Sequence, residues 1–104
     1  MKTKAEFERA MEDTFCKEIR KDGCIPYKSE TRGLKDHPDE LVLTPQRTFY
    51  WMEFKLPGED LSDGQRIRFD QLKRKGHSVY KVTNLDMAFF YHEYEMNRNN
   101  DFRP

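Results

Sequence analysis

Hydrophobic residues recur every four positions near the start of the chain. This spacing places them on one face of an amphipathic helix spanning residues 4–21. Thr3 precedes the helix as an N-cap, with Glu6 at the reciprocal capping-box position, and Gly23 ends it. The stripe consists of Phe7, Met11, Phe15 and Ile19.

Shorter apolar runs follow this helix, and their residue types predict strands. Pro26 makes the first run an edge strand, because proline cannot donate a hydrogen bond to a neighbouring strand. A turn at residues 45–47 separates the second run from the third, so these two can pair as a hairpin. The four predicted strands cover residues 24–28, 40–44, 48–55 and 77–82.

Two more helices complete the predicted order. Ser62 is the N-cap of a helix that continues to about residue 75 and stops at Gly76. Its expected buried side consists of Ile67, Phe69 and Leu72. Residues 85–96 are rich in aromatic side chains and form the last helix. The order helix, three strands, helix, strand, helix predicts an α/β fold with a small mixed sheet.

The length of 104 residues predicts one domain with a small core. Hydrophobic residues make up 36% of the chain and charged residues 37%, with a mean hydropathy of −1.05. Aromatic residues (13%) must therefore supply much of the buried area. A small chain with few aliphatic residues is also expected to form a homodimer.

Charge, cysteine content and hydropathy restrict the class of protein. Basic and acidic residues balance at 19 each, so any nucleic-acid binding must depend on local patches. Cys16 and Cys24 lack the spacing of a zinc site and are expected to be free thiols. The chain has no apolar run of membrane-spanning length and no signal peptide, which predicts a cytoplasmic protein without membrane contact.

Charged residues at the end of the aromatic strand identify a candidate site. Glu53 and Lys55 point to the same face, because side chains alternate along a strand. If the hairpin forms, Asp39 lies beside Glu53. Two carboxylates and an ammonium group on one patch are the arrangement of a divalent-metal nuclease site.

Phosphodiester hydrolysis requires a nucleophilic water and stabilisation of developing negative charge. Mg²⁺ or Mn²⁺ can supply both, held by Asp39, Glu53 and the carbonyl of Phe54. Lys55 is expected to orient or deprotonate the water, or to neutralise the transition state. Gln65, in the first turn of the next helix, is expected to hold a metal-bound water or a phosphate.

Basic residues in two regions are candidates for phosphate contacts. Lys28, Arg32 and Lys35 surround the polar loop at residues 29–37, although a solvated loop explains them equally well. Arg66 and Lys73 belong to a cluster of five basic residues on the second helix.

The pair Pro38-Asp39 followed by Glu53-Phe54-Lys55 resembles the PD-(D/E)xK nuclease motif. The surrounding order of elements over residues 8–82 resembles the VRR-NUC (virus-type replication–repair nuclease) family, with small stand-alone members in phages and bacteria. The resemblance implies a restriction-endonuclease-like αβββαβ core with a C-terminal helix, in one domain over residues 1–104.

The family resemblance also implies a function. It suggests metal-dependent DNA hydrolysis by a homodimer acting on branched DNA such as Holliday junctions, in a bacterial or phage-infected cell. It also implies a metal-site glutamate on the first helix, for which Glu12 is the first choice and Glu8 the second. The family glycine before the PD pair is replaced here by residues 35–37, Lys-Asp-His.

Two other functions compete with the nuclease. One is a DNA-binding module that keeps the nuclease fold without catalysis and uses the basic second helix. The other is a structural protein in which Glu53 and Lys55 are only an exposed strand face. The sequence lacks a Ser/His/Asp arrangement and a GxxxxGK loop, which argues against an acyl hydrolase or an NTPase. His37, His77 and His92 have no metal-ligand spacing.

Overall fold

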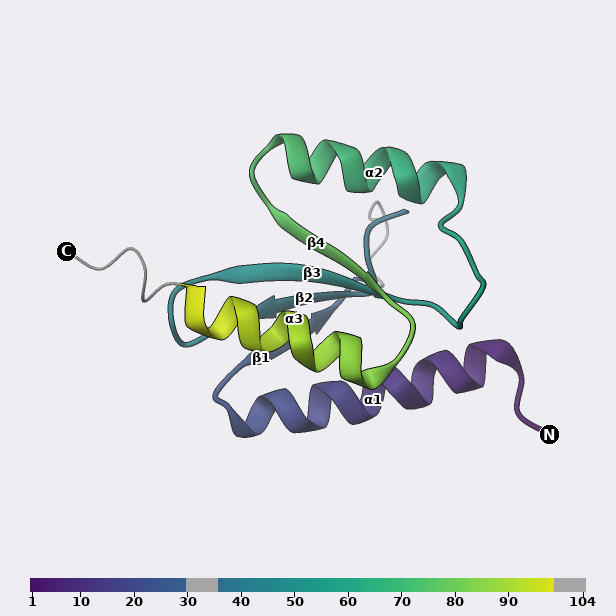
Figure 1. Cartoon of the computed structure of the whole chain (residues 1–104), viewed down its shortest axis with the longest axis horizontal. Coiled ribbons are helices and arrows are strands. Elements are labelled where there is room, and N and C mark those ends of the chain that lie inside the picture. Colours follow the sequence, from purple (N-terminus) through teal and green to yellow (C-terminus); the bar gives the residue numbers. More distant parts are fainter. Residues whose placement is uncertain (30–35, 99–104) are drawn as a thin grey trace.

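Four strands form one mixed sheet in the order β1-β2-β3-β4 (Figure 1). The computed structural model describes residues 1–29 and 36–98. Strands β1, β2 and β3 pair antiparallel, and β4 lies parallel to β3. The strands are β1 (Ile25–Lys28), β2 (Glu40–Leu43), β3 (Phe49–Phe54) and β4 (Ser78–Val82). The predicted mixed sheet and the edge position of β1 are confirmed.

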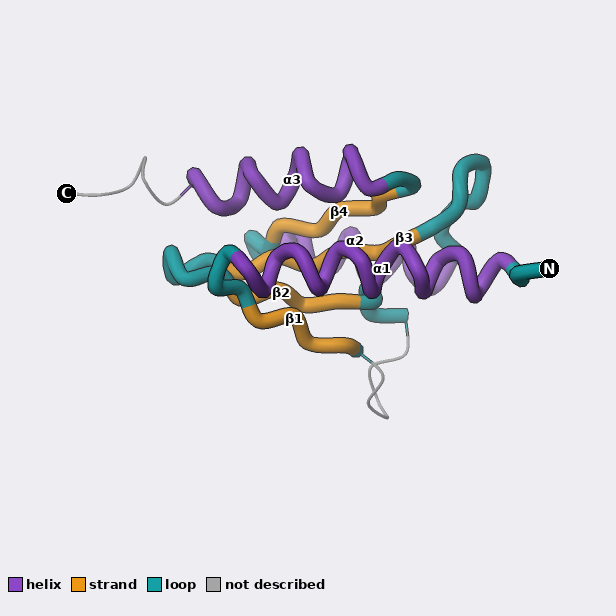
Figure 2. Tube along the Cα trace, turned by 90° about the horizontal axis from the view of Figure 1, so that it is seen from below, coloured by secondary structure: helices purple, strands orange, loops and turns teal. Residues whose placement is uncertain are grey.

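Three helices cover the two faces of the sheet. Helices α1 (Lys4–Lys21) and α3 (Leu85–Arg98) lie on one face, and α2 (Asp63–Arg74) lies on the other, behind the sheet in Figure 2. The parallel pairing of β3 and β4 requires a crossover connection, which α2 provides. Among the described residues, no helix is long and apolar enough to cross a membrane.

The core lies between the sheet and the helices α1 and α3, and aromatic side chains dominate it. The Phe15 ring is fully buried, 5.5 Å from the ring of Phe54 on β3 and 5.3 Å from the ring of Phe89 on α3. Phe7, predicted to share the buried stripe of α1, is half exposed. Figure 1 gives the reason, because the N-terminal part of α1 extends past the end of the sheet.

The predicted buried face of α2 is wrong at one position. Phe69 is buried and Leu72 is partly buried, but Ile67 is 61% exposed. A helix turns by about 100° per residue, which places Phe69 and Leu72 about 60° apart and Ile67 on the opposite side. Only one side of α2 faces the sheet, so the three residues cannot all be buried.

The two thiols and one histidine behave as expected from the sequence. Cys16 and Cys24 are free and buried. His92 lies in the core, where its Nδ1 is 2.8 Å from the Tyr50 hydroxyl and its Nε2 is 2.8 Å from Asp22 Oδ2. Both ring nitrogens therefore have partners, and this histidine connects α3 to β3 and to the C-cap of α1.

Candidate active site

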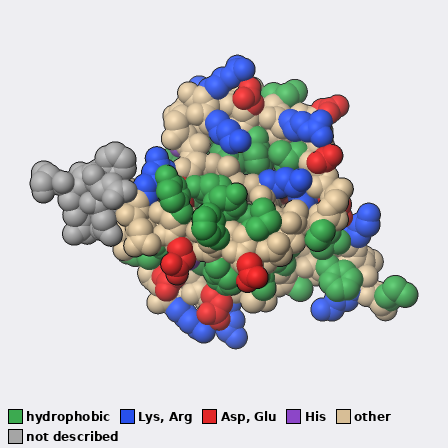
Figure 3. Space-filling view, viewed as in Figure 1, with side chains coloured by type: hydrophobic (Ala, Val, Ile, Leu, Met, Phe, Trp, Pro, Cys, Tyr) green, Lys and Arg blue, Asp and Glu red, His purple; other side chains and the backbone are tan. Residues whose placement is uncertain are grey.

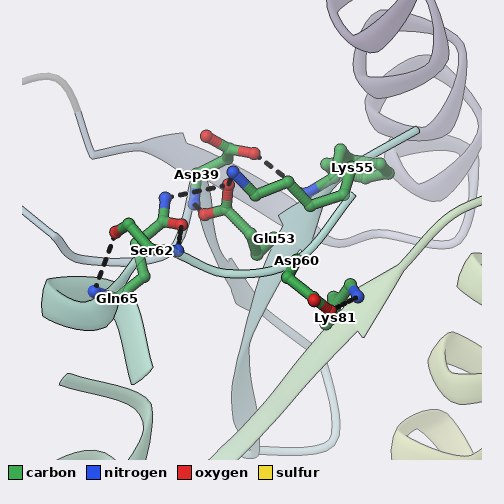
Figure 4. A network of polar contacts seen from close by, with 8 residues as sticks. Asp39, Glu53, Lys55, Asp60, Ser62, Gln65 and Lys81 are labelled. Carbon is green, nitrogen blue, oxygen red and sulfur yellow. Dashed lines mark hydrogen bonds and ion pairs between the residues drawn. The ribbon is translucent and has the colours of Figure 1, made fainter. Parts of the chain in front are cut away.

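Asp39 and Glu53 hold each other in place at one end of the sheet. The antiparallel register pairs Glu40 with Met52, and Asp39 and Glu53 follow directly. The Asp39 backbone N–H donates to Glu53 Oε1 (3.1 Å), and the Phe54 backbone N–H donates to Asp39 Oδ2 (2.9 Å; Figure 4). Each carboxylate is thus held by the backbone of the opposite segment.

Lys55 and Gln65 approach the same carboxylate oxygen. Lys55 Nζ lies 3.9 Å from Glu53 Oε2, and Gln65 Nε2 lies 3.5 Å from that atom (Figure 4). Gln65 is held by a capping box at the start of α2, in which its Oε1 accepts from the Ser62 backbone N–H at 2.9 Å. The four residues predicted as catalytic therefore lie together, supplied by β3, α2 and the residue before β2.

Burial determines the electrostatics of this group. Glu53 is 4% exposed, and burial followed by the charge of Asp39 raises its pKa to about 8, with Lys55 opposing. Burial also raises the pKa of Asp39, although the hydrogen bond from Phe54 and the Lys55 charge oppose the change. A buried carboxylate and a partly buried one beside a single ammonium group favour a bound cation, which would neutralise their negative charge.

The carboxylates suit a divalent cation that keeps most of its water. Among the described residues, no three His, Cys, Asp or Glu side chains form a group that could hold a metal ion. Mg²⁺ commonly uses only one or two carboxylates and keeps several waters. Asp39 and Glu53 supply two, so the oxygen donors present fit Mg²⁺ or Mn²⁺ better than a cation that needs a full protein cage.

Comparison with known proteins places this geometry in a family. No family model matches the chain. One relative, described as "Putative nuclease p44" from Acyrthosiphon pisum secondary endosymbiont phage 1, is 32% identical over 81 residues, covering 78% of this chain and 87% of the relative. A solved structure described as a VRR_NUC domain matches with a TM-score of 0.76 at 18% identity, covering 84% of this chain and 95% of that domain. This chain belongs to the family of that putative phage nuclease and has the fold of the VRR_NUC domain.

The loop before Asp39 differs from the VRR-NUC pattern in sequence but keeps a glycine-like conformation. Asp36 has φ of +70°, in the left-handed region that glycine favours. Its carboxylate packs against Gly64 in the first turn of α2, where an added Cβ would lie 2.5 Å from Asp36 Oδ2. The negative charge lies at the positive end of the α2 dipole, which favours this loop position.

The two first-helix glutamates, Glu8 and Glu12, lie in different surroundings. Glu12 lies beside Glu40, and burial followed by the contact with Glu40 raises its pKa. Burial and Glu59 raise the pKa of Glu8, which also feels the charges of Lys55 and Asp39. Within the described part of the chain, neither glutamate forms a hydrogen bond with Asp39 or Glu53.

Glu40 is an acidic residue of this region that the sequence analysis did not identify. Its side chain is fully buried on the core side of β2, near Glu12 and Cys16, and burial raises its pKa. The strand register indicates why Glu40 is buried. Glu40 pairs with buried Met52, and residues opposite each other on neighbouring strands share one face of the sheet.

The structure describes three of the five predicted phosphate-binding residues, and two of these three lie together. Lys28 ends β1, with Nζ 3.6 Å from Asp13 Oδ1. Arg66 and Lys73 lie on α2 and line a common hollow beside Phe69, and Arg66 also lies 3.8 Å from Asp60 Oδ2 and 3.6 Å from Asp63 Oδ1. Arg32 and Lys35 lie outside the described residues.

Proposed function

We propose that this protein is a Mg²⁺- or Mn²⁺-dependent DNA endonuclease that hydrolyses phosphodiester bonds. One observation carries the proposal: Asp39 and Glu53 are interlocked by backbone hydrogen bonds, with Lys55 and Gln65 both directed at Glu53. A protein that only binds DNA gains nothing from buried carboxylates facing phosphate. A nuclease needs them, because they attract the cation that offsets phosphate charge.

Each residue has a separate task in this proposal. Asp39 and Glu53 would hold the cation, with the Phe54 carbonyl as a third oxygen, and the cation would supply Lewis-acid stabilisation of the phosphate and a more acidic water. Lys55 places its positive charge beside Glu53, where it can orient the attacking water or offset charge on the phosphate. Gln65, fixed by its capping box, positions a water or phosphate oxygen from the α2 side.

We propose that an acid of the first helix acts at the edge of the site, although among the described residues it forms no three-acid metal group with Asp39 and Glu53. Glu12 is the first choice, because the charge of Asp39 contributes to the raised pKa of Glu12. Glu8 is the second candidate, since it also feels Asp39 and Lys55. Comparing Glu12→Gln with Glu8→Gln in cleavage assays will separate the two, because only loss of the metal-site acid should raise the Mg²⁺ concentration needed for cutting.

We propose branched DNA, such as a four-way junction, as the substrate of a homodimer. Support for a second copy comes from α3, whose outer side exposes the large side chains Phe90 and Tyr94 beside a hollow of about 680 Å³. Two active sites held at a fixed spacing can cut two strands of a branched substrate, whereas one site cuts a single strand.

A cleavage panel with purified protein tests the proposal. Linear, flap, fork and four-way DNA are incubated with Mg²⁺, with Mn²⁺ or with EDTA, and branched DNA should be cut only when metal is present. Asp39→Asn keeps an oxygen for the Phe54 N–H, and Lys55→Ala removes the ammonium group and its aliphatic stem outside the hydrophobic core, so both should fold and lose about 10²-fold or more in rate.

Lys17→Ala is the matched control, since Lys17 is exposed on α1, and it should cut normally. Full activity in both Asp39→Asn and Lys55→Ala would refute the assignment of these residues. Tight DNA binding without cleavage under any metal would instead identify a binding module.

A further inference from the structure

A second basic hollow lies at the end of the sheet opposite Glu53. It has a volume of about 230 Å³ and opens where β3 and β4 begin. We call this hollow the distal basic pocket. Its lining includes Arg47, His77, Ser78 and Arg98. They come from the turn before β3, the start of β4 and the end of α3, so the fold brings three separate segments together.

The distal basic pocket carries more positive than negative charge. Arg98 donates to Ser78 Oγ at 2.6 Å and lies 3.4 Å from the buried carboxylate of Glu95. Arg47 is exposed, and within the described residues no acidic side chain pairs with it. Two guanidinium groups and an imidazole therefore line the pocket, and only Arg98 among them has a carboxylate partner in the described residues, which favours binding of an anion.

The backbone and packing hold two of these groups in position. Arg47 has φ of +67°, a left-handed conformation that is costly for a residue other than glycine, and its N–H donates to the Thr44 carbonyl at 3.3 Å. The His77 ring packs on the Phe49 ring with centroids 5.1 Å apart. An arginine kept at a strained turn position and a packed imidazole form a prepared surface rather than a loose group of side chains.

Helix α2 connects the distal basic pocket to the candidate active site. Its first turn holds Gln65 beside Glu53, and its C-terminal end leads through Gly76 to His77. Residues 63–75 contain five basic and two acidic side chains. Figure 3 shows Lys and Arg side chains, with some Asp and Glu among them, over the part of the surface that α2 occupies in Figure 1. Arg66 and Arg74 pair with neighbouring acids, but basic residues outnumber acidic ones along α2, so net positive charge lies between the two ends of the sheet.

The distance between these two ends corresponds to a short stretch of duplex. Strand β3 runs from Phe49 beside the distal basic pocket to Phe54 beside Asp39. Five steps of about 3.3 Å separate these residues, or roughly 17 Å. B-DNA rises about 3.4 Å per base pair, so the two sites are about five base pairs apart.

We propose that the distal basic pocket binds a backbone phosphate of the DNA duplex about five base pairs from the cleaved bond. The inference rests on the proposed nuclease function, because it takes the duplex to leave the active site along α2. Phosphate is the anion that guanidinium groups and an imidazole bind in combination, and such a contact orients the duplex without reading its sequence.

Arg47→Ala tests the proposal without disturbing the core, because Arg47 is exposed. Fluorescence anisotropy measures the affinity for DNA junctions, with Ca²⁺ in place of Mg²⁺. The junction arms have either about four base pairs, too short to reach the pocket, or about twelve, long enough to extend past it. On the long arms the variant should bind about three- to tenfold more weakly and lose about one unit of salt slope, as expected for one lost phosphate contact. On the short arms it should match the wild type.

Two matched variants control the measurement. Lys17→Ala removes an exposed charge from α1, on the other face of the sheet from α2, and should change neither affinity nor salt slope. Arg47→Lys keeps the charge and should retain most of the affinity. Equal affinity of Arg47→Ala and wild type on long arms at every salt concentration would overturn the proposal.

The result separates the distal basic pocket from the nuclease function itself. If wild type cuts DNA and Arg47→Ala cuts and binds equally well, only the pocket assignment fails. If the wild-type protein neither binds nor cuts DNA, the proposed nuclease function is refuted, and the pocket assignment that rests on it is refuted as well. Inorganic phosphate is the second probe, and NMR signals of His77 report its binding. Half-saturation below about 1 mM, a binding free energy of about −4 kcal/mol, would identify a site for a free phosphate compound and overturn the DNA assignment.

Discussion

Glu53 is the residue at which stability and function oppose each other. Its side chain is almost fully buried, yet it points at a second carboxylate, and Lys55, Gln65 and the Asp39 backbone N–H offset its charge only in part. Burying a charged group is costly unless it is fully compensated. The folded chain therefore favours the protonated acid until a cation binds, which ties the pH dependence of stability to the metal site.

The metal-free protein should become less stable as the pH rises from about 4.5 to about 8. Glu53 has a pKa near 4.5 when unfolded and about 8 when folded, so the folded state binds more protons over this range and stability falls with pH. Thermal melting in EDTA at pH 5 and at pH 8.5 measures the effect. Glu53→Gln removes the charge and should melt at a higher temperature than wild type at the higher pH, by about 4–8 °C for each kcal/mol relieved.

Glu18→Gln is the control for this experiment, because Glu18 is an exposed acid paired with Lys21 on α1. It should keep the pH dependence of the wild type. Mg²⁺ should raise the melting temperature of wild type more at pH 8.5 than at pH 5. A melting temperature that rises steadily from pH 5 to pH 8.5 in EDTA would contradict this account of Glu53.

At the scale of one element, α2 combines a structural cap with a part of the site. Ser62 and Gln65 form a capping box, which satisfies two backbone N–H groups at the helix start. The same Gln65 side chain turns its amide nitrogen toward Glu53. The helix start is therefore both the end of a loop and the positioning device for a candidate catalytic residue.

Ser62→Ala should lower both stability and cleavage rate. Loss of an N-cap costs about 1 kcal/mol, or roughly 4–8 °C in melting temperature for a domain of this size. The rate should also fall, because the Gln65 backbone N–H loses its bond to Ser62 Oγ and the first turn that positions Gln65 is loosened, although the Ser62 backbone N–H still donates to Gln65 Oε1. Melting curves and single-turnover cleavage measure the two effects.

Thr3→Ala provides the matched comparison, since Thr3 caps α1 in the same way, far from Glu53 in the sequence. It should cost similar stability and leave the cleavage rate unchanged. Equal cleavage by Ser62→Ala and wild type would show that Gln65 needs no cap to work.

At the scale of the whole molecule, the outer side of α3 exposes large aromatic side chains beside a hollow. Hydrophobic side chains gather over α3 and β4 in Figure 3. Phe90 is 70% exposed and Tyr94 57%, and both line the hollow of about 680 Å³. Exposed aromatic patches of this kind mark protein contact surfaces in small domains.

Phe90→Glu combined with Tyr94→Glu should convert the proposed homodimer into a monomer. Two charges placed in an apolar contact are costly to bury, so the dissociation constant should rise by about tenfold or more, equal to about 1.4 kcal/mol. Light scattering after size exclusion measures the mass. Ile67→Glu, an exposed position on α2, is the control and should not change it. A wild-type protein that is monomeric at all concentrations would rule out the dimer.

The local pattern of this sequence determined its elements and the partners at the candidate site. Alternation along a strand placed Glu53 and Lys55 on one face, and the turn between two apolar runs brought Asp39 beside them. Caps, glycine stops and periodicity located the helices within a few residues. Each of these signals acts over a few positions, so each can be read from the chain alone.

Only the tertiary structure decided which faces are buried and which distant segments meet. Ile67 is apolar yet exposed, and Glu40 is acidic yet fully buried, because helix packing on the two sheet faces settles what each side contacts. The distal basic pocket joins the turn before β3, the start of β4 and the end of α3. Burial and long-range proximity depend on how elements pack, and that arrangement is not encoded in spacing along the chain.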